Sequence, residues 1–180
     1  QILIANLQYS DDYNSTCAGK AIGTLNDYSN THSSWVPSAG VTDAQFDITK
    51  GALYSPYLTN KEIFVCPSDN NPITPLSYSI NSQLYDNDVS AQGSDGVTYP
   101  KYSQFTQMPD RLIIFVDQGQ PDDGTFDTGD PATATTLAEN IKWYHNNQAS
   151  FGYLDGHTEL RSKDDKFINS PSSYNWKPQQ

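Results

Sequence analysis

Positive charge is scarce in this sequence. Lys and Arg number 10 against 21 Asp and Glu, which gives a formal net charge of −11 and a pI near 4.3. A protein that binds the phosphate backbone of nucleic acid needs a basic stripe that attracts the phosphates. The chain has no such stripe, so we do not expect nucleic acid as a partner.

Long apolar runs are also missing. The longest, Leu112 to Val116, is far shorter than the roughly 20 residues that a membrane-spanning helix needs. No stretch has the pattern of a signal peptide. The chain starts at Gln1 without Met, which we interpret as the result of processing or of trimming for expression.

Cysteine is limited to Cys17 and Cys66, which are far apart and belong to no CxxC or His-rich pattern. Neither a zinc motif nor a redox motif is therefore indicated. We predict a disulfide between the two, because the composition is that of an exported protein and disulfides persist in oxidising compartments. The alternative is two reduced, buried cysteines that act as small hydrophobic side chains.

Motifs of hydrolytic enzymes are absent as well. There is no G-x-S-x-G elbow, and neither cysteine has a recognisable His partner. Only three of the 21 acidic residues are Glu, and none marks a carboxylate pair for glycoside hydrolysis. We predict that the protein is not an enzyme. The alternative is a secreted carbohydrate-binding or glycoside-hydrolysing domain, because 12 Tyr and three Trp can form a stacking platform for sugar rings.

The chain does contain the residues that build strands and turns. Its 180 residues suit a single domain over 1–180, and abundant Ser, Thr, Asn, Asp, Gly and Pro favour a loop-rich α+β fold. Leu3 and Leu7 predict an amphipathic helix that ends near Asp12. Trp35 is an expected anchor onto the core. A short helical turn is expected over 53–58.

Several segments have the pattern of strands. Alternation over 76–80 predicts a half-buried strand, and the β-branched run in "RLIIFVD" predicts a central one. Extended structure is also expected over 63–66, 141–145, 150–154 and 157–160. The last two strands would meet at Asp155-Gly156, a dipeptide typical of the type I′ turn, and the preceding turn would fall at Asn146-Asn147.

Acidic residues concentrate between Asp86 and Asp130, where nine Asp accompany two basic residues. Carboxylate oxygens are the ligands that Ca²⁺ prefers. EF-hand spacing fails, since Ala91 and Thr128 stand where that loop needs Gly. A looser Ca²⁺ site and a merely solvated acidic loop remain as alternatives. The candidate ligands are Asp117, Asp122, Asp123, Asp127 and Asp130.

His145 and His157 flank Asp155-Gly156 and could suggest a catalytic dyad. If the strands run as predicted, however, His145 and Asp155 lie at opposite ends of one strand, roughly 20 Å apart. A dyad between them is therefore disfavoured. His145 can still meet Asp117 or another distant residue in the folded chain. We interpret the stretch as a β-hairpin with satisfied polar side chains.

His145, nine intervening residues and then Asp155-Gly156 form an H-X9-DG signature. In this the chain resembles a bacterial family of prepilin-like proteins related to type II secretion pseudopilins and type IV pilins. Four other segments are similar to family segments and occur in the same order: "NLQYSDDYN" at 6–14, "GALYSPYL" with "IFVCPSD", "YSIN" at 78–81, and "MPDRLIIFVD".

The resemblance implies a pilin-like fold in which residues 1–13 are the C-terminal half of a helical spine packed on an antiparallel sheet. It implies a structural subunit of a type IV pilus or type II secretion-type filament. Its partners would be other pilin-like subunits and the secretion or pilus machinery, at the periplasm or cell surface.

The family's charged leader and apolar anchor helix are missing before Gln1. We expect contact with the membrane only through that missing helix, which would anchor the precursor in the inner membrane before assembly. Similar major pseudopilins bind Ca²⁺ in a C-terminal loop, which favours a calcium-ordered loop here. The resemblance assigns no catalytic role to His145, Asp155 or Gly156.

Overall fold

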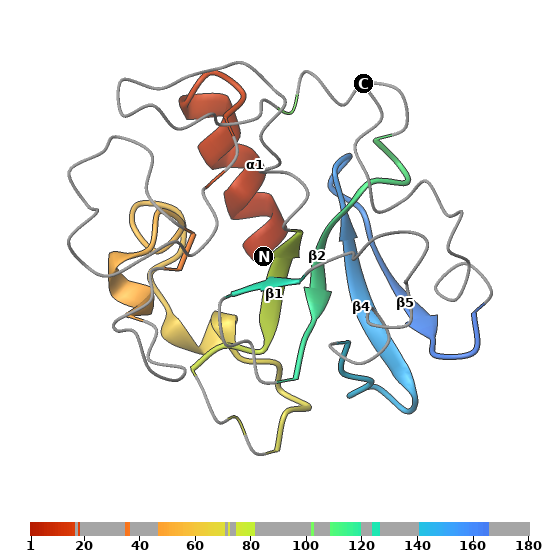
Figure 1. Cartoon of the computed structure of the whole chain (residues 1–180). Helices are drawn as coiled ribbons and strands as arrows, with labels where there is room; N and C mark the ends of the chain where they lie inside the picture. Colours follow the sequence, from red (N-terminus) through yellow and green to blue (C-terminus); the bar gives the residue numbers. More distant parts are fainter. Residues whose placement is uncertain are drawn as a thin grey trace.

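The computed structural model describes residues 1–16, 18, 35–36, 47–70, 72, 75–81, 102, 109–119, 124–126 and 141–165. These residues form an α+β domain with one helix packed beside one sheet (Figure 1). The elements are α1 (Ile2–Asp12), the 3-10 helices η2 (Ile48–Lys50) and η3 (Lys61–Phe64), and the strands β1 (Tyr78–Asn81), β2 (Ile113–Asp117), β3 (Thr125–Phe126), β4 (Gln148–Tyr153) and β5 (Thr158–Ser162).

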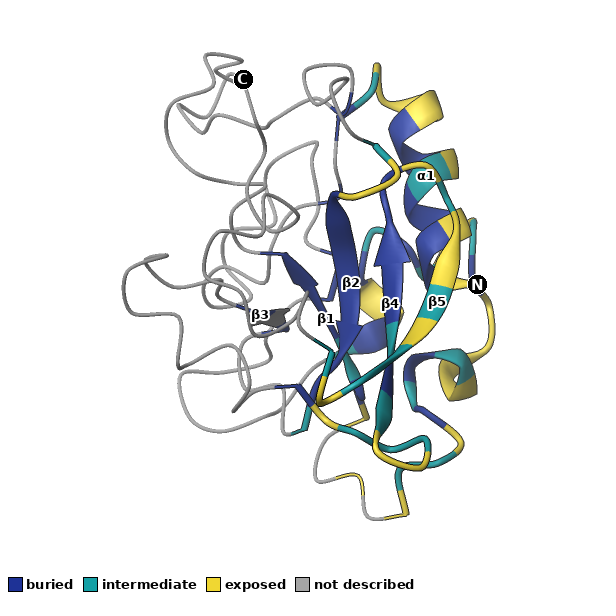
Figure 2. Cartoon of the chain, turned by 90° about the vertical axis from the view of Figure 1, so that its right-hand side faces the viewer, coloured by how far each residue is buried: buried dark blue, intermediate teal, exposed yellow. Residues whose placement is uncertain are grey.

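The sheet has the strand order β3-β1-β2-β4-β5. β1, β2, β4 and β5 pair antiparallel, and the short β3 lies parallel to β1. Every residue of β2 is buried, which confirms the prediction of a central strand from its continuous apolar run. β5 forms an edge, and its residues are exposed or half-buried (Figure 2).

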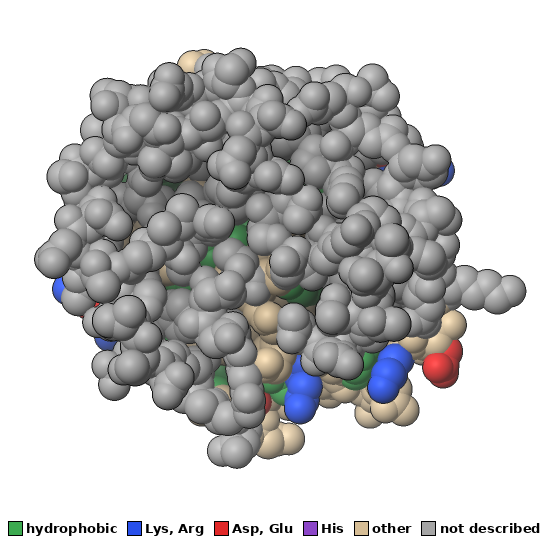
Figure 3. Space-filling model, in the orientation of Figure 1, with side chains coloured by type: hydrophobic (Ala, Val, Ile, Leu, Met, Phe, Trp, Pro, Cys, Tyr) green, Lys and Arg blue, Asp and Glu red, His purple; other side chains and the backbone are tan. Residues whose placement is uncertain are grey.

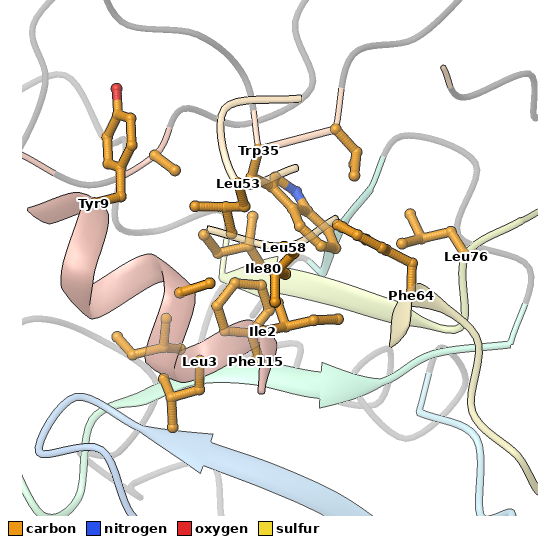
Figure 4. Packing of buried hydrophobic residues seen from close by; sticks show 14 of the residues in the cluster. Ile2, Leu3, Tyr9, Trp35, Leu53, Leu58, Phe64, Leu76, Ile80 and Phe115 are labelled. Carbon is orange, nitrogen blue, oxygen red and sulfur yellow. The ribbon is translucent and has the colours of Figure 1, made fainter. Parts of the chain in front are cut away.

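The predicted N-terminal helix is confirmed as α1, which lies against one face of the sheet (Figures 1 and 2). Its Leu3 and Tyr9 join a core cluster that includes Ile80 and Phe115 of the sheet (Figure 4). Burial of each such side chain contributes roughly 1.5–3 kcal/mol. Within the described residues, no helix is long and apolar enough to cross a bilayer.

Two loop anchors complete this core. Trp35 is fully buried, as expected, and its Nε1–H donates to the carbonyl of Gly124 at 3.0 Å. The predicted turn over 53–58 is present, with the amide of Leu58 donating to the carbonyl of Leu53 at 2.9 Å.

Basic side chains that can be seen in Figure 3 lie along the rim of the molecule in that view.

Two predictions of extended structure were wrong. Of the segment predicted over 63–66, the first two residues belong to η3, because the Asn60 side chain accepts a hydrogen bond from the Glu62 amide and caps a helical turn. Val65 is extended but lies outside the strands of the sheet. Over 141–145, Ile141 makes a single bridge to Gln118, and the residues after it leave the sheet.

The β4–β5 hairpin is confirmed, but not its type I′ turn. Gly156 has φ +92°, whereas Asp155 is not among the residues with positive φ. The amide of Gly156 donates to the carbonyl of Tyr153, and the amide of Tyr153 donates to the carbonyl of His157. This is a three-residue connection, a common hairpin form with a left-handed last residue. The Asp155 carboxylate favours it by accepting from the His157 amide at 3.1 Å.

The pairing of β2 with β4 shifts register between Ile113 and Phe115. Ile113 and Val116 belong to a second core cluster on the far face of the sheet, with Phe151 and Tyr153 of β4. Phe115 belongs to the cluster that contains α1. Because side chains alternate along a strand, Asp117 follows Phe115 onto the face that α1 covers.

Candidate functional site

Three chemically reactive side chains converge where β2 ends. Cys66 follows η3, Asp117 is the last residue of β2, and His145 precedes the turn into β4. One ligand atom from each lies within 4.8 Å of the others. The fold thus gathers a thiol, a carboxylate and an imidazole from three separate segments.

The imidazole of His145 is the centre of this cluster. Its Nε2 lies 3.5 Å from Cys66 Sγ and 3.3 Å from Asp117 Oδ2. Its Nδ1 lies 3.3 Å from the hydroxyl of Ser68. One ring nitrogen therefore faces both acidic groups, while the other faces a neutral hydroxyl.

Asp117 is only partly satisfied. Its Oδ2 accepts a hydrogen bond from the Ser150 amide at 2.7 Å. Its Oδ1 is buried and has no hydrogen-bond partner among the described residues. Because an unpaired buried acceptor costs about 1–3 kcal/mol, the cluster holds an oxygen that a ligand can stabilise.

Burial sets the electrostatics of the cluster. Asp117 and Cys66 are 0% and 1% exposed. Burial raises the pKa of Asp117, against the opposing hydrogen bond from Ser150, and burial likewise raises the pKa of Cys66. Both groups thus resist ionisation, since a low-dielectric site disfavours the charged form. The His145 side chain is 27% exposed and connects the cluster to solvent.

A shell of hydrogen bonds fixes the Cys66 turn. The amide of Asp69 donates to the carbonyl of Cys66 at 2.9 Å. The Asp69 carboxylate accepts from the hydroxyls of Ser77 at 2.9 Å and Tyr144 at 2.7 Å. The turn is therefore tied both to the start of β1 and to the residue before His145.

The geometry does not match a nucleophilic triad. In such a triad the imidazole contacts the nucleophile through one nitrogen and the carboxylate through the other. Here Cys66 and Asp117 both lie at Nε2, and the buried Cys66 has a raised pKa. Sulfur, nitrogen and carboxylate oxygen are instead donors that transition metals bind.

The structure locates part of the predicted calcium and disulfide residues. Asp117 lies inside the protein beside Cys66 and His145. Cys66 is a buried free cysteine. The remaining residues lie outside the described ranges, so the calcium loop and the disulfide stay predictions. These are Cys17, Asp122, Asp123, Asp127 and Asp130.

The motif residues His145 and Asp155 lie at opposite ends of β4, as the strand spacing predicts. Asp155 pairs with His157 instead, with its Oδ1 2.5 Å from His157 Nδ1 at an exposed turn. His145 reaches Asp117, the distant residue that sequence reasoning named without being able to place.

Sequence reasoning missed the participation of Cys66 in this cluster. A signal was nevertheless present in three of the sequence segments quoted above. "IFVCPSD" supplies Cys66, "MPDRLIIFVD" supplies Asp117, and the H-X9-DG signature supplies His145. Three separate motifs thus converge at one place.

The comparisons with known proteins identify no relative. No protein-family model, no curated protein and no solved structure matches the chain. We therefore infer its function from the fold and from the side-chain geometry described above.

Proposed function

We propose that the chain is the head domain of a pilin-like filament subunit, with a structural rather than an enzymatic role. The packing of α1 on the antiparallel sheet carries the proposal, because leucine side chains of α1 lie directly against glycines of the β4–β5 hairpin. A Cβ on Gly152 would lie 3.2 Å from Leu3 Cδ2. A helix packed on such a sheet is the arrangement that the family resemblance implies.

Gly156 of the H-X9-DG signature lies at the same contact. A Cβ there would lie 3.2 Å from Leu7 Cδ1, and the residue has φ +92°. Glycine is favoured at such a φ because it has no side chain to clash. The motif glycine therefore shapes the hairpin and admits the helix, which supports a structural role for the signature.

A cavity of about 420 Å³ at the amino end of α1 adds support. Its lining includes Gln1 and Ile2, at the start of the helix, together with the apolar residues Ile63 and Phe115. In a longer subunit, residues that continue α1 upstream of Gln1 would lie at the mouth of this cavity. They would cover apolar surface and extend the helix as a spine.

The alternative of a glycoside-hydrolysing domain gains no support from this cavity. Hydrolysis of a glycosidic bond uses two carboxylates that flank the bond. Among the described residues that line the cavity, Glu62 is the one carboxylate. The described part of the chain therefore favours the structural proposal.

Photo-crosslinking of the complete gene product in its own host tests the proposal. A photoreactive amino acid replaces Ile4, which is 57% exposed on α1. We expect ladders of crosslinked subunits in the membrane and filament fractions. We also expect the codons upstream of Gln1 to encode about 20 apolar residues, enough to span a bilayer.

The matched control carries the same amino acid at Leu160, which is 51% exposed on the edge strand β5. It has similar exposure but belongs to the edge strand of the sheet and not to the helix. An upstream region that encodes a cleavable signal peptide without a retained apolar segment would contradict the proposal. So would Ile4 crosslinks confined to monomers in assembled material.

A further inference from the structure

We propose that Cys66, Asp117 and His145 bind one divalent transition-metal ion of the Zn²⁺ class, through Sγ, Oδ2 and Nε2. The inference does not depend on a role in filaments, because it rests on the geometry of the three side chains alone. Thiolate, carboxylate and neutral imidazole are all established donors to Zn²⁺.

Two of the three distances between the donor atoms match those of a tetrahedral site, and all three atoms lie within 4.8 Å of one another. With Zn–S near 2.3 Å and Zn–N and Zn–O near 2.0 Å, tetrahedral angles give about 3.5 Å between S and N and about 3.3 Å between N and O. Cys66 Sγ lies 3.5 Å, and Asp117 Oδ2 3.3 Å, from His145 Nε2. Both distances to His145 Nε2 therefore suit an ion that this nitrogen shares with Cys66 Sγ and Asp117 Oδ2.

Hydrogen bonds alone explain this arrangement poorly. An imidazole nitrogen carries either one hydrogen or one lone pair, so Nε2 can make one well-directed bond. Asp117 Oδ2, 3.3 Å from Nε2, lies beyond the usual range for an N–H···O hydrogen bond, and Cys66 Sγ, at 3.5 Å, competes for the same nitrogen. A cation between them would be bound by all three donor atoms at once.

The unsatisfied oxygen of Asp117 is a second, independent observation. The side chain is 0% exposed, and in the part of the chain that the structure describes its Oδ1 has no hydrogen-bond partner. Buried charges in proteins are paired or coordinate metals. A bound cation would compensate the Asp117 charge and could draw in Oδ1 by bidentate coordination.

Ser68 provides the outer contact that metal-binding histidines usually have. If Nδ1–H of His145 donates to the Ser68 hydroxyl, 3.3 Å away, the lone pair of Nε2 faces Cys66 and Asp117. Such contacts fix the tautomer and the ring orientation of a metal ligand. Cys66 and Ser68 lie two residues apart, so one turn supplies both a donor atom and its support.

The donor set also selects the metal. Thiolate and imidazole suit Zn²⁺ and similar ions, whereas Ca²⁺ and Mg²⁺ take oxygen ligands. Three protein donors leave a fourth position for water, as in open zinc sites. On binding, the Cys66 thiol releases its proton to solvent and the thiolate forms the metal–sulfur bond. The part-exposed His145 gives the ion a path inward.

Titration of the reduced, metal-free protein with Co²⁺ tests the site directly. We expect one equivalent to give a thiolate-to-metal charge-transfer band and the intense visible bands of tetrahedral Co²⁺. We expect Zn²⁺ to displace it, and Ca²⁺ to have no effect. Cys66→Ser should remove the charge-transfer band, and Asp117→Asn or His145→Gln should abolish stoichiometric binding.

His157→Gln is the matched control, because His157 also pairs with an aspartate but lies at the exposed end of β4. It should bind Co²⁺ as the wild type does. Binding that survives His145→Gln, or that His157→Gln abolishes, would overturn the proposal. Near-ultraviolet circular dichroism establishes that each variant is folded.

X-ray absorption of the Zn²⁺-loaded wild type keeps the proposal testable if the variants do not fold. We expect one sulfur scatterer near 2.3 Å and nitrogen or oxygen scatterers near 2.0 Å. A shell of nitrogen and oxygen alone would overturn it. The sample must be reduced, since a disulfide between Cys17 and Cys66 would remove the sulfur ligand.

Discussion

Strand β4 has a histidine–aspartate pair at each end, and the two pairs differ in every respect except their chemistry. At one end His145 meets Asp117 from the end of a different strand, and the carboxylate is fully buried. At the other end His157 meets Asp155 across a tight turn, with side chains 42% and 34% exposed. The first pair depends on the fold, and the second depends only on a turn.

The difference shows how environment decides what such a pair can do. Exposed ion pairs contribute about 0–1 kcal/mol because water and salt screen them. A buried carboxylate must instead be compensated, and burial raises the pKa of Asp117. The buried pair also has Cys66 as a third donor. The buried end is therefore suited to bind an ion, and the exposed end is suited to hold a hairpin.

The largest expected difference between the two ends is stabilisation by metal. At a free Zn²⁺ concentration a thousand times the Kd, the free energy of unfolding should rise by about 4 kcal/mol. His157→Gln should keep this increment, and His145→Gln should lose it. Urea denaturation in chelator and in buffered Zn²⁺ measures both. An equal increment in the two variants would contradict the difference that we infer.

The turns at the two ends should respond differently to substitution. Gly156→Ala should lower the free energy of unfolding by about 1–2 kcal/mol, the cost of a left-handed conformation for a residue with a Cβ. Asn147→Gly at the other end should change it by less than about 0.5 kcal/mol, because φ there is already +62°. Urea denaturation compares the two. A larger loss for Asn147→Gly would contradict this account.

The contact between Ser68 and the His145 ring should affect the Zn²⁺ affinity more than the free energy of unfolding. Ser68→Ala removes the hydroxyl beside Nδ1, and we expect it to weaken Zn²⁺ binding about tenfold, the lower range for loss of an outer contact. The cobalt spectrum should keep its charge-transfer band. Competition with a chromophoric chelator measures the affinity. Thr158→Ala, an exposed position near the other histidine, is the control and should have no effect.

The smallest effect is expected at the exposed pair itself. Asp155→Asn removes the charge but keeps an oxygen that can accept from the His157 amide. We expect a change in the free energy of unfolding below about 0.5 kcal/mol, measured by urea denaturation at low and high salt. A loss of more than about 1 kcal/mol in the free energy of unfolding would mean that the exposed pair also stabilises the fold, and it would contradict the difference that we infer between the two ends of β4.

Local patterns were sufficient for much of the described fold. The spacing of Leu3 and Leu7 predicts α1, and the apolar run 112–116 predicts β2, because each pattern records which face of an element is buried. The Asp155-Gly156 dipeptide predicts the hairpin. Its exact turn was not predictable, because the hydrogen bond from the His157 amide to Asp155 selects a longer connection.

Local patterns failed where a single side chain or a tertiary contact decides the outcome. The cap from Asn60 produces η3 where a strand was expected. The cluster of Cys66, Asp117 and His145 joins segments that are close only in the folded chain. Spacing along β4 could exclude a pair between His145 and Asp155. It could not show that His145 lies beside Asp117 and Cys66 instead.

The register shift in β2 changes which face of the sheet the side chains after it occupy. Before it, Ile113 faces the core away from α1, and after it, Phe115 faces α1. Deletion of one residue at this point would turn Asp117 to the opposite face, away from Cys66 and His145. The extra residue in β2 thus determines the sheet face of both Phe115 and Asp117. A deletion at this point would therefore disturb the hydrophobic core and also separate Asp117 from Cys66 and His145.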